Sequence, residues 1–168
     1  MTWGIKMNYE RMRALNPNKM LEKGKRYARA GNQKNAFLWY KQAAKRCSPE
    51  ACFLMGEAYF LGKYVKQDYR QALQYYKLAG KYLGSEKQDG PIMADILYRL
   101  SVCYFYGYGV TPNNLQALAY EDDAEAFIVY TRSDPRKYEW QCRRIFYLGL
   151  KIRRAYEREI MDKDSEDL

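Results

Sequence analysis

Small residues, tyrosines and alanines recur along the chain at fixed spacing in three places. The three copies are Gly24, Tyr27, Ala36, Tyr40 and Ala43; Gly56, Tyr59, Ala72, Tyr76 and Ala79; and Ser101, Tyr104, Ala117, Glu121 and Ala124. The tyrosine always follows the small residue by three positions, and the later gaps of four and three place those side chains on one helical stripe. Each copy therefore predicts two antiparallel helices that approach closely where side chains are smallest.

The turn inside each copy is the part that varies. From the tyrosine to the first alanine the gap is nine residues in the first copy and thirteen in the other two. The longer turns contain the glycine-bearing segments Leu61–Val65 and Tyr106–Val110. Glycine lets the chain leave a helix in a left-handed conformation, so these segments predict the exits from the first helix of each hairpin.

The second copy resembles a Sel1-like repeat (SLR), a branch of the tetratricopeptide (TPR) superfamily. The resemblance covers Ala51–Gly80 and rests on an ordered set of residues: Gly56, Tyr59, Gly62, Val65, Asp68, Ala72, Leu73, Tyr75, Tyr76 and Ala79. In the third copy Ser101, Asn113 and Glu121 replace the glycine, the aspartate and the aromatic residue, and the first copy has the shorter turn of an ordinary TPR unit. The resemblance implies an all-α protein, a right-handed α-solenoid of about three antiparallel helical hairpins, one TPR-like and two SLR-like, closed by an amphipathic C-terminal capping helix.

The repeats predict how the chain is divided. We expect an N-terminal extension at 1–16, one domain over 17–160 and a disordered acidic tail at 161–168. Within the domain the predicted units are 17–46, 49–80 and 93–130, followed by the capping helix at 135–160. A polar connector, Lys81–Ile92, adds about nine residues between the second and third units.

The predicted C-terminal helix is two-sided. It begins at Ser133-Asp134-Pro135, and its apolar arc holds Cys142, Ile145, Phe146, Leu148, Gly149, Ile152, Tyr156 and Ile160. The opposite, basic face holds Arg136, Lys137, Trp140, Arg143, Arg144, Tyr147, Lys151, Arg154 and Arg158. The pattern fits a terminal helix that covers the last hairpin and exposes solvated charge, and it also fits a docking surface for an acidic peptide or a nucleic acid.

Composition gives no support for catalysis. The chain has no histidine, which removes imidazole-activated nucleophiles and imidazole metal sites, and it has no phosphate-cradling motif. The acidic run Glu121–Glu125 is interpreted as a solvated helix face rather than a metal site, because consecutive acids on a helix point in different directions. We therefore expect no catalytic residue, no metal and no cofactor.

The cysteines and the hydropathy of the chain indicate the cellular compartment in which the protein resides. Cys47, Cys52, Cys103 and Cys142 show no CxxC spacing, which favours free core thiols and leaves a disulfide between helices open. No segment approaches the ~20 apolar residues of a membrane span, and Met1–Arg13 lacks the apolar run of a secretory signal. The sequence therefore predicts a cytoplasmic protein without membrane insertion.

The resemblance also implies a function. SLR and TPR arrays act as adaptors that present a concave surface, lined mostly by the first helix of each hairpin, to a peptide or a partner protein. The roles of bacterial relatives imply a partner that is a secreted effector, a toxin or an assembly component. Superposing the copies places Lys25, Arg29, Phe53, Glu57, Phe60, Tyr98, Val102 and Phe105 on that surface. The net charge of +9 predicts a partner with acidic character, and a nucleic acid bound by the C-terminal helix is the alternative.

Overall fold

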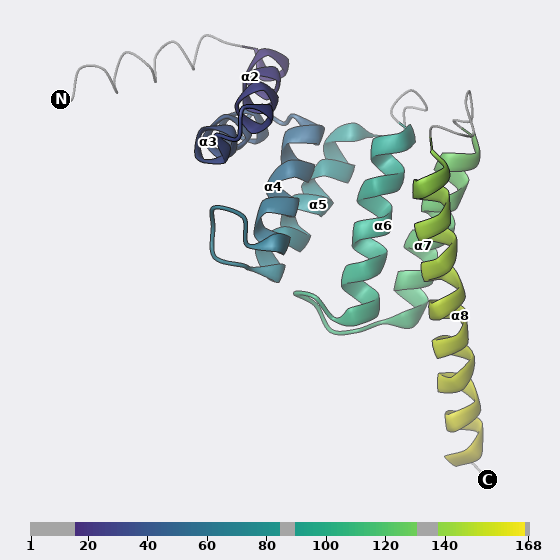
Figure 1. Cartoon of the computed structure of the whole chain (residues 1–168). Coiled ribbons are helices and arrows are strands. Elements are labelled where there is room, and N and C mark those ends of the chain that lie inside the picture. The colour runs from purple at the N-terminus through teal and green to yellow at the C-terminus, as the bar shows by residue number, and fades with distance from the viewer. Residues whose placement is uncertain (1–15, 85–89, 131–137, 167–168) are drawn as a thin grey trace, which may run out of the picture. The chain divides into compact units, whose positions relative to one another are not determined.

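The computed structural model describes residues 16–84, 90–130 and 138–166, and every regular element in these ranges is an α-helix (Figure 1). This confirms the all-α fold class. The helices are α2 (Pro17–Arg29), α3 (Gln33–Ala44), α4 (Pro49–Leu61), α5 (Tyr69–Leu83), α6 (Gly90–Tyr106), α7 (Asn114–Tyr130) and α8 (Glu139–Glu166). None of the helices in these ranges combines the length and the apolar character that crossing a bilayer requires.

Polar side chains fix where the helices of the repeats begin. Asn16, Asn32 and Ser48 each accept a hydrogen bond from a backbone N–H of the first turn of α2, α3 and α4. Asp68 and Asn113 do the same for α5 and α7. These caps satisfy amides that have no partner inside the helix, so each helix begins at a residue that the sequence specifies.

An equivalent backbone hydrogen bond closes each of the three hairpin turns. The N–H groups of Asp68 and Asn113 donate to the carbonyls of Tyr59 and Tyr104, at 3.0 and 2.9 Å. In the first, shorter turn the N–H of Asn32 donates to the carbonyl of Tyr27 at 2.9 Å. The tyrosine at the end of the first helix is therefore tied to the capping residue of the second helix in every repeat. The four additional residues form a loop between these fixed ends, with Gly62 and Gly107 at positive φ.

The glycines at the predicted crossings lie against tyrosine rings. A Cβ atom built on Gly24 would lie 2.5 Å from Cε1 of Tyr40, and one built on Gly56 would lie 2.5 Å from Cε1 of Tyr76. In the third repeat the hydroxyl of Ser101 is fully buried and donates to the carbonyl of Ala117 at 2.8 Å. The prediction that these three residues mark close crossings is confirmed.

The chain divides into two compact units, residues 1–82 and 83–168, which are described separately below. The sequence predicted one domain over 17–160, and the division falls at the long connector that it placed between the second and third repeats. Unit 1 holds the two N-terminal hairpins, and unit 2 holds the third hairpin and α8. Each unit has buried apolar residues of its own. In unit 2 they include Met93, Ala94, Leu97, Ala124, Ile128 and Ile145, from α6, α7 and α8.

The C-terminal helix differs from its predicted bounds. α8 begins at Glu139 and ends at Glu166, whereas the prediction ran from 135 to 160, and Ser133-Asp134-Pro135 lies outside the described residues. The segment that was expected to form a disordered acidic tail is helical from 161 to 166. Lys163 pairs with Glu159 one turn earlier at 2.8 Å, and Glu159 accepts a hydrogen bond from Asn114 of α7 at 3.0 Å. These contacts offset the acidic composition of the last turns.

Candidate partner-binding surfaces

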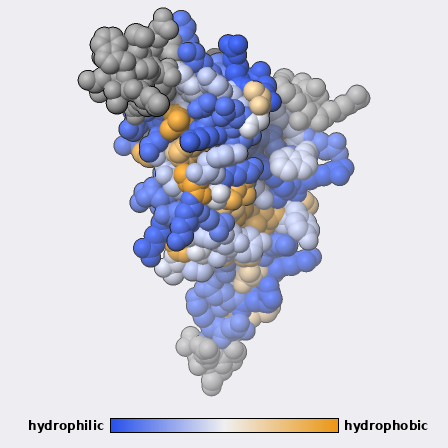
Figure 2. Space-filling model, turned by 60° about the vertical axis from the view of Figure 1, so that its left-hand side comes forward, coloured by the Kyte–Doolittle hydropathy of each residue, from blue (hydrophilic) through white to orange (hydrophobic). Residues whose placement is uncertain are grey.

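A groove of about 380 Å³ lies in unit 1 between the first hairpin and α4. Its lining is mostly apolar and aromatic, and it comes from α2, α3, α4 and the loop after α4: Ala28, Gln33, Ala36, Phe37, Tyr40, Phe53, Leu54, Glu57, Ala58, Leu61, Lys63 and Tyr64. Leu61 and Tyr64 are exposed at its edge. Apolar side chains also reach the surface among hydrophilic ones on the face shown in Figure 2. The groove has the size and the lining of a site for apolar side chains.

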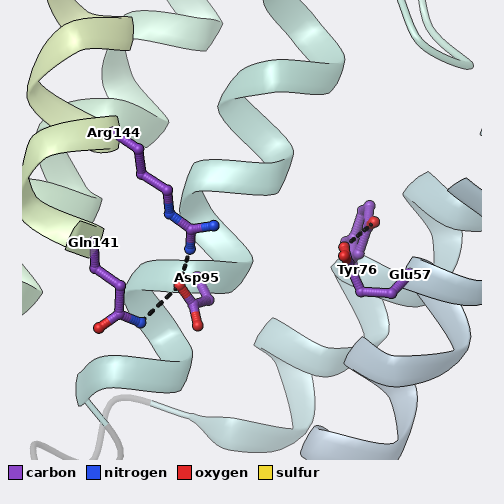
Figure 3. Close-up of polar contacts among 5 residues, drawn as sticks. All are labelled: Glu57, Tyr76, Asp95, Gln141 and Arg144. Atoms are coloured by element: carbon purple, nitrogen blue, oxygen red, sulfur yellow. Dashed lines mark hydrogen bonds and ion pairs between the residues drawn. The ribbon is translucent and has the colours of Figure 1, made fainter. Parts of the chain in front are cut away.

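A hydrogen bond fixes the acidic residue of this groove. Tyr76 of α5 donates from its hydroxyl to Oε1 of Glu57 on α4 at 2.6 Å (Figure 3). The Tyr76 ring is fully buried against Gly56, and its centroid lies 5.9 Å from that of Phe53. The tyrosine that closes the second hairpin therefore also holds the Glu57 carboxylate and the Phe53 ring at the groove.

The predicted concave residues of unit 1 have different environments. Phe53 and Glu57 line the groove, but Phe60 packs between α4 and α5, with its ring centroid 5.2 Å from that of Tyr69. The ammonium group of Lys25 lies 2.8 Å from Glu50 and 3.2 Å from Glu22, so it pairs with carboxylates of this chain. Arg29 is exposed near the end of α2 and does not line the groove. Of the five residues predicted for the concave surface of unit 1, Phe53 and Glu57 line the groove and the other three do not.

The three concave residues predicted in unit 2 are largely covered. Val102 is buried, Phe105 is half-buried with its ring centroid 4.7 Å from that of Tyr106, and the Arg144 guanidinium lies 4.3 Å from the centroid of the Tyr98 ring. These residues contribute mainly to packing within unit 2.

Arg144 faces α6 rather than solvent. Its guanidinium pairs with Asp95, which also accepts a hydrogen bond from Gln141 at 2.8 Å (Figure 3). The guanidinium is stacked between the rings of Tyr98 and Trp140, 4.3 and 4.5 Å from their centroids. The prediction that placed Arg144 on the exposed basic face was wrong, because Asp95 on α6 offers a carboxylate that the sequence of α8 alone could not reveal.

Some of the other residues on the predicted basic face contact side chains of the same helix. Arg143 is exposed and pairs with Glu139 at 2.6 Å, and the Lys151 ammonium lies 5.0 Å from the Tyr147 ring centroid. Trp140, Tyr147, Lys151, Arg154 and Arg158 are exposed, as predicted. Arg136 and Lys137 lie outside the described residues. α8 therefore exposes fewer unpaired basic groups than its sequence suggests.

Glu121 is buried between α7 and α8. Its side chain is fully buried against Gly149, and its Oε2 atom lies 3.1 Å from Nη2 of Arg153 without hydrogen-bond geometry. Burial raises the pKa of Glu121 to about 7, although Arg153 opposes the shift. Its neighbours Asp122 and Asp123 are exposed, so the prediction of a solvated acidic face holds for them and was wrong for Glu121.

The four cysteines all lie in the described ranges, and none of them forms a disulfide. Cys52 and Cys103 are buried, and burial raises the pKa of the Cys52 thiol to about 11. Cys47 is exposed in the turn after α3, with a positive φ of 60°. The prediction of core thiols was wrong for Cys47. This residue lies three positions after Ala44, where α3 ends, so α3 does not direct its side chain into the core.

Each hairpin has an equivalent close crossing, an equivalent backbone hydrogen bond in its turn and equivalent capping residues. Tandem hairpins of this kind define a helical-repeat protein of the α-solenoid class. The Sel1 repeat matches residues 19–46, 49–81 and 94–120, more than half of the chain. The chain therefore belongs to the Sel1-repeat family, a scaffold family whose members generally act in protein–protein interaction.

Solved structures share this fold. A Sel1 repeat protein from Oxalobacter formigenes is similar at 26% identity over 72% of this chain and 88% of that protein, with a TM-score of 0.59. A protective antigen present in uropathogenic Escherichia coli strains, which displays an SLR fold, is 24% identical over 90% of this chain, with a TM-score of 0.56. This chain spans about a third of that antigen. No curated protein matches the chain.

Proposed function

We propose that the groove of unit 1 binds an apolar segment of a partner protein. The observation that carries the proposal is the lining of the groove, in which aromatic and aliphatic side chains from α3 and α4 form an open apolar surface. Aromatic side chains in a partly enclosed site provide most of the binding energy of protein interfaces. Interaction with other proteins is also the general role of Sel1-repeat proteins.

The polar residues at the groove set the orientation of the bound segment. Glu57 is held by Tyr76, and Lys63, in the loop after α4, also lines the groove. A short segment with an apolar side chain for the aromatic floor and polar groups for Glu57 and Lys63 fits this arrangement.

Site-specific photo-crosslinking in the native source tests the proposal. A p-benzoyl-phenylalanine residue replaces Leu61 at the groove edge or, as the matched control, Leu115 on α7; both leucines are exposed. We expect a protein adduct at position 61 and none at 115, and we expect Leu54→Gln within the groove to reduce the adduct at 61. Equal adducts at both positions, or an adduct at 61 that Leu54→Gln leaves unchanged, would contradict the proposal. Circular dichroism confirms that each variant is folded.

A further inference from the structure

The net positive charge of the protein comes from unit 1. Residues 1–82 carry 17 Lys and Arg against 5 Asp and Glu, a net charge of +12, whereas residues 83–168 carry 12 against 15, a net charge of −3. A partner with a net negative charge is therefore attracted more strongly to unit 1 than to unit 2 as a whole.

Within unit 1, basic residues follow one stripe of α3. Lys34, Lys41 and Lys45 are separated by seven and then four residues, which brings them to the same side of the helix, with Leu38 between them. Lys34, Leu38 and Lys45 are exposed and Lys41 is half-buried. The segment from Gln33 to Cys47 contains no acidic residue. The stripe faces away from Ala36 and Tyr40, which α3 directs at α2 and the groove.

The same three repeat positions are basic in α5. Counted from the first alanine of each repeat, Lys34, Lys41 and Lys45 correspond to Arg70, Lys77 and Lys81, all of which are exposed. α5 also contains no acidic residue. We call these six basic residues of α3 and α5 the basic ladder. In the third repeat the same positions hold Leu115, Asp122 and Ala126, so the ladder is specific to unit 1.

The two stripes of the ladder belong to one unit and to consecutive repeats. Interaction with the thiol of Cys47, two residues after Lys45, raises the pKa of the Tyr82 hydroxyl, next to Lys81 on α5. This contact brings the C-terminal ends of the two stripes together. Such a repeated surface attracts a ligand that extends over both helices.

We propose that the basic ladder binds an acidic α-helix of a partner protein, whose carboxylates recur three and four residues apart. This proposal rests on the proposed protein-binding function but concerns a surface separate from the groove. A helix whose carboxylates have this spacing matches the basic residues of α3 along the whole stripe, because both helices have the same period.

The composition of the ladder favours a polypeptide over other polyanions. Five of its six basic residues are lysines, which act as point charges and lack the planar fork with which arginine binds both carboxylate and phosphate. The positions between them are Leu38 and Gln74, so no aromatic ring lies within the stripes to stack on a nucleic-acid base. Leu38 is the one apolar side chain among them, too little for insertion into a lipid surface.

Fluorescence anisotropy with a defined probe tests the proposal on the full chain. The probe is a labelled helical peptide of alanine and glutamate in which the glutamates alternate at gaps of three and four. A peptide of the same composition with the glutamates spread around the helix is the control for spacing. We expect the patterned peptide to bind more tightly than the control, a 20-nucleotide oligothymidylate and phosphatidylserine-containing vesicles. Tighter binding of the control, the oligonucleotide or the vesicles would overturn the proposal.

Matched variants locate the site. Lys34→Gln/Lys41→Gln/Lys45→Gln removes one stripe, and Arg26→Gln/Arg29→Gln/Lys66→Gln removes the same charge from exposed residues of unit 1 outside the ladder. We expect the first variant to weaken peptide binding about tenfold, because each exposed ion pair changes affinity a few-fold at most. We expect the second to weaken it less than threefold. Equal losses would overturn the proposal. Leu54→Gln in the groove should leave peptide affinity unchanged, which separates a failure of the ladder from a failure of the groove.

Discussion

The position four residues after the first alanine of each repeat holds an aromatic residue twice and a carboxylate once. Tyr40 and Tyr76 fill this position in unit 1, and each ring packs on the glycine of its own hairpin. Glu121 fills it in unit 2, where its side chain lies instead against Gly149 of α8. The carboxylate thus joins the third hairpin to the C-terminal helix, and it introduces a buried ionisable group at that contact.

Glu121→Gln is expected to stabilise unit 2 in a pH-dependent way. Because the pKa of Glu121 is raised from 4.5 to about 7, the folded state holds the proton more tightly than the unfolded chain does. The stability of the wild type should therefore fall as the pH rises from about 4.5 to 7. At about 1.4 kcal/mol per pKa unit, glutamine is expected to raise the free energy of unfolding by up to about 3 kcal/mol at pH 8 and by little at pH 4.5.

Chemical denaturation at the two pH values measures this effect. The matched control is Asp123→Asn, which removes the same charge from an exposed neighbour. A gain for Glu121→Gln that is equal at both pH values, or a gain of the same size for Asp123→Asn at pH 8, would contradict the assignment of the effect to the buried carboxyl.

Gly56→Leu is expected to destabilise the second hairpin. A Cβ atom at this position would lie 2.5 Å from the ring of the fully buried Tyr76, so α4 and α5 must separate to accept a larger side chain. We expect a loss of about 1–3 kcal/mol in the free energy of unfolding, measured by thermal or chemical denaturation. Ala126→Leu, at an exposed position of α7, adds three of the same four carbon atoms, and it should change stability by less than about 0.5 kcal/mol. An unchanged midpoint for Gly56→Leu would refute the close crossing.

At the scale of elements, α8 is held by contacts that reach two different helices. Gly149 and Arg153 meet Glu121 on α7, whereas Gln141 and Arg144 meet Asp95 on α6. The buried Ile145, Leu148 and Ile152 lie on the apolar arc that the sequence predicted. Polar contacts therefore set the rotation of α8 about its axis, which hydrophobicity alone leaves open.

Arg144→Ala and Arg143→Ala are expected to have different effects although the two residues are adjacent. The Arg144 side chain is 19% exposed, pairs with Asp95 and stacks on two rings, whereas that of Arg143 is 78% exposed. We expect Arg144→Ala to reduce the free energy of unfolding by about 1–3 kcal/mol, because the Asp95 carboxylate loses its cation. Arg143→Ala should cost less than about 0.5 kcal/mol. Similar losses in urea denaturation would show that Arg144 does not anchor α8.

At the scale of the whole molecule, the two units have net charges of opposite sign. The +12 of residues 1–82 exceeds the net charge of the entire chain, and the second unit is weakly acidic. The total of +9 therefore understates the attraction of unit 1 for an acidic partner, because the net charge of unit 2 has the opposite sign.

Association of the acidic helical probe with the protein should depend strongly on salt. Long-range attraction by unit 1 accelerates the encounter, and counterions screen it over about 10 Å at 0.1 M ionic strength. We expect the association rate constant, measured by stopped-flow fluorescence, to fall about tenfold between 0.02 and 0.2 M salt, with a smaller change in the dissociation rate constant. A peptide with glutamine in place of glutamate is the control. An association rate constant that does not change with salt would contradict steering by charge.

The sequence by itself determined the repeats, their helices and their crossings. Gly24, Gly56 and Ser101 could be found because a crossing needs a small residue at one position of a periodic pattern, and the turns could be found because glycine and a capping side chain act locally. These features depend on residues close together along the chain. They can be predicted without knowing where any other element lies.

Only the tertiary structure decided which polar groups are available to a partner. Lys25, Arg144 and Glu121 each lie on a helix face that the sequence assigns to solvent, and each meets a residue of another element: Glu50, Asp95 and Gly149. The groove of unit 1 likewise combines side chains from three helices and a loop. The free energy of a charge depends on all groups within a few ångströms of it. Those groups come from different helices, and the repeat pattern does not specify which of their side chains meet.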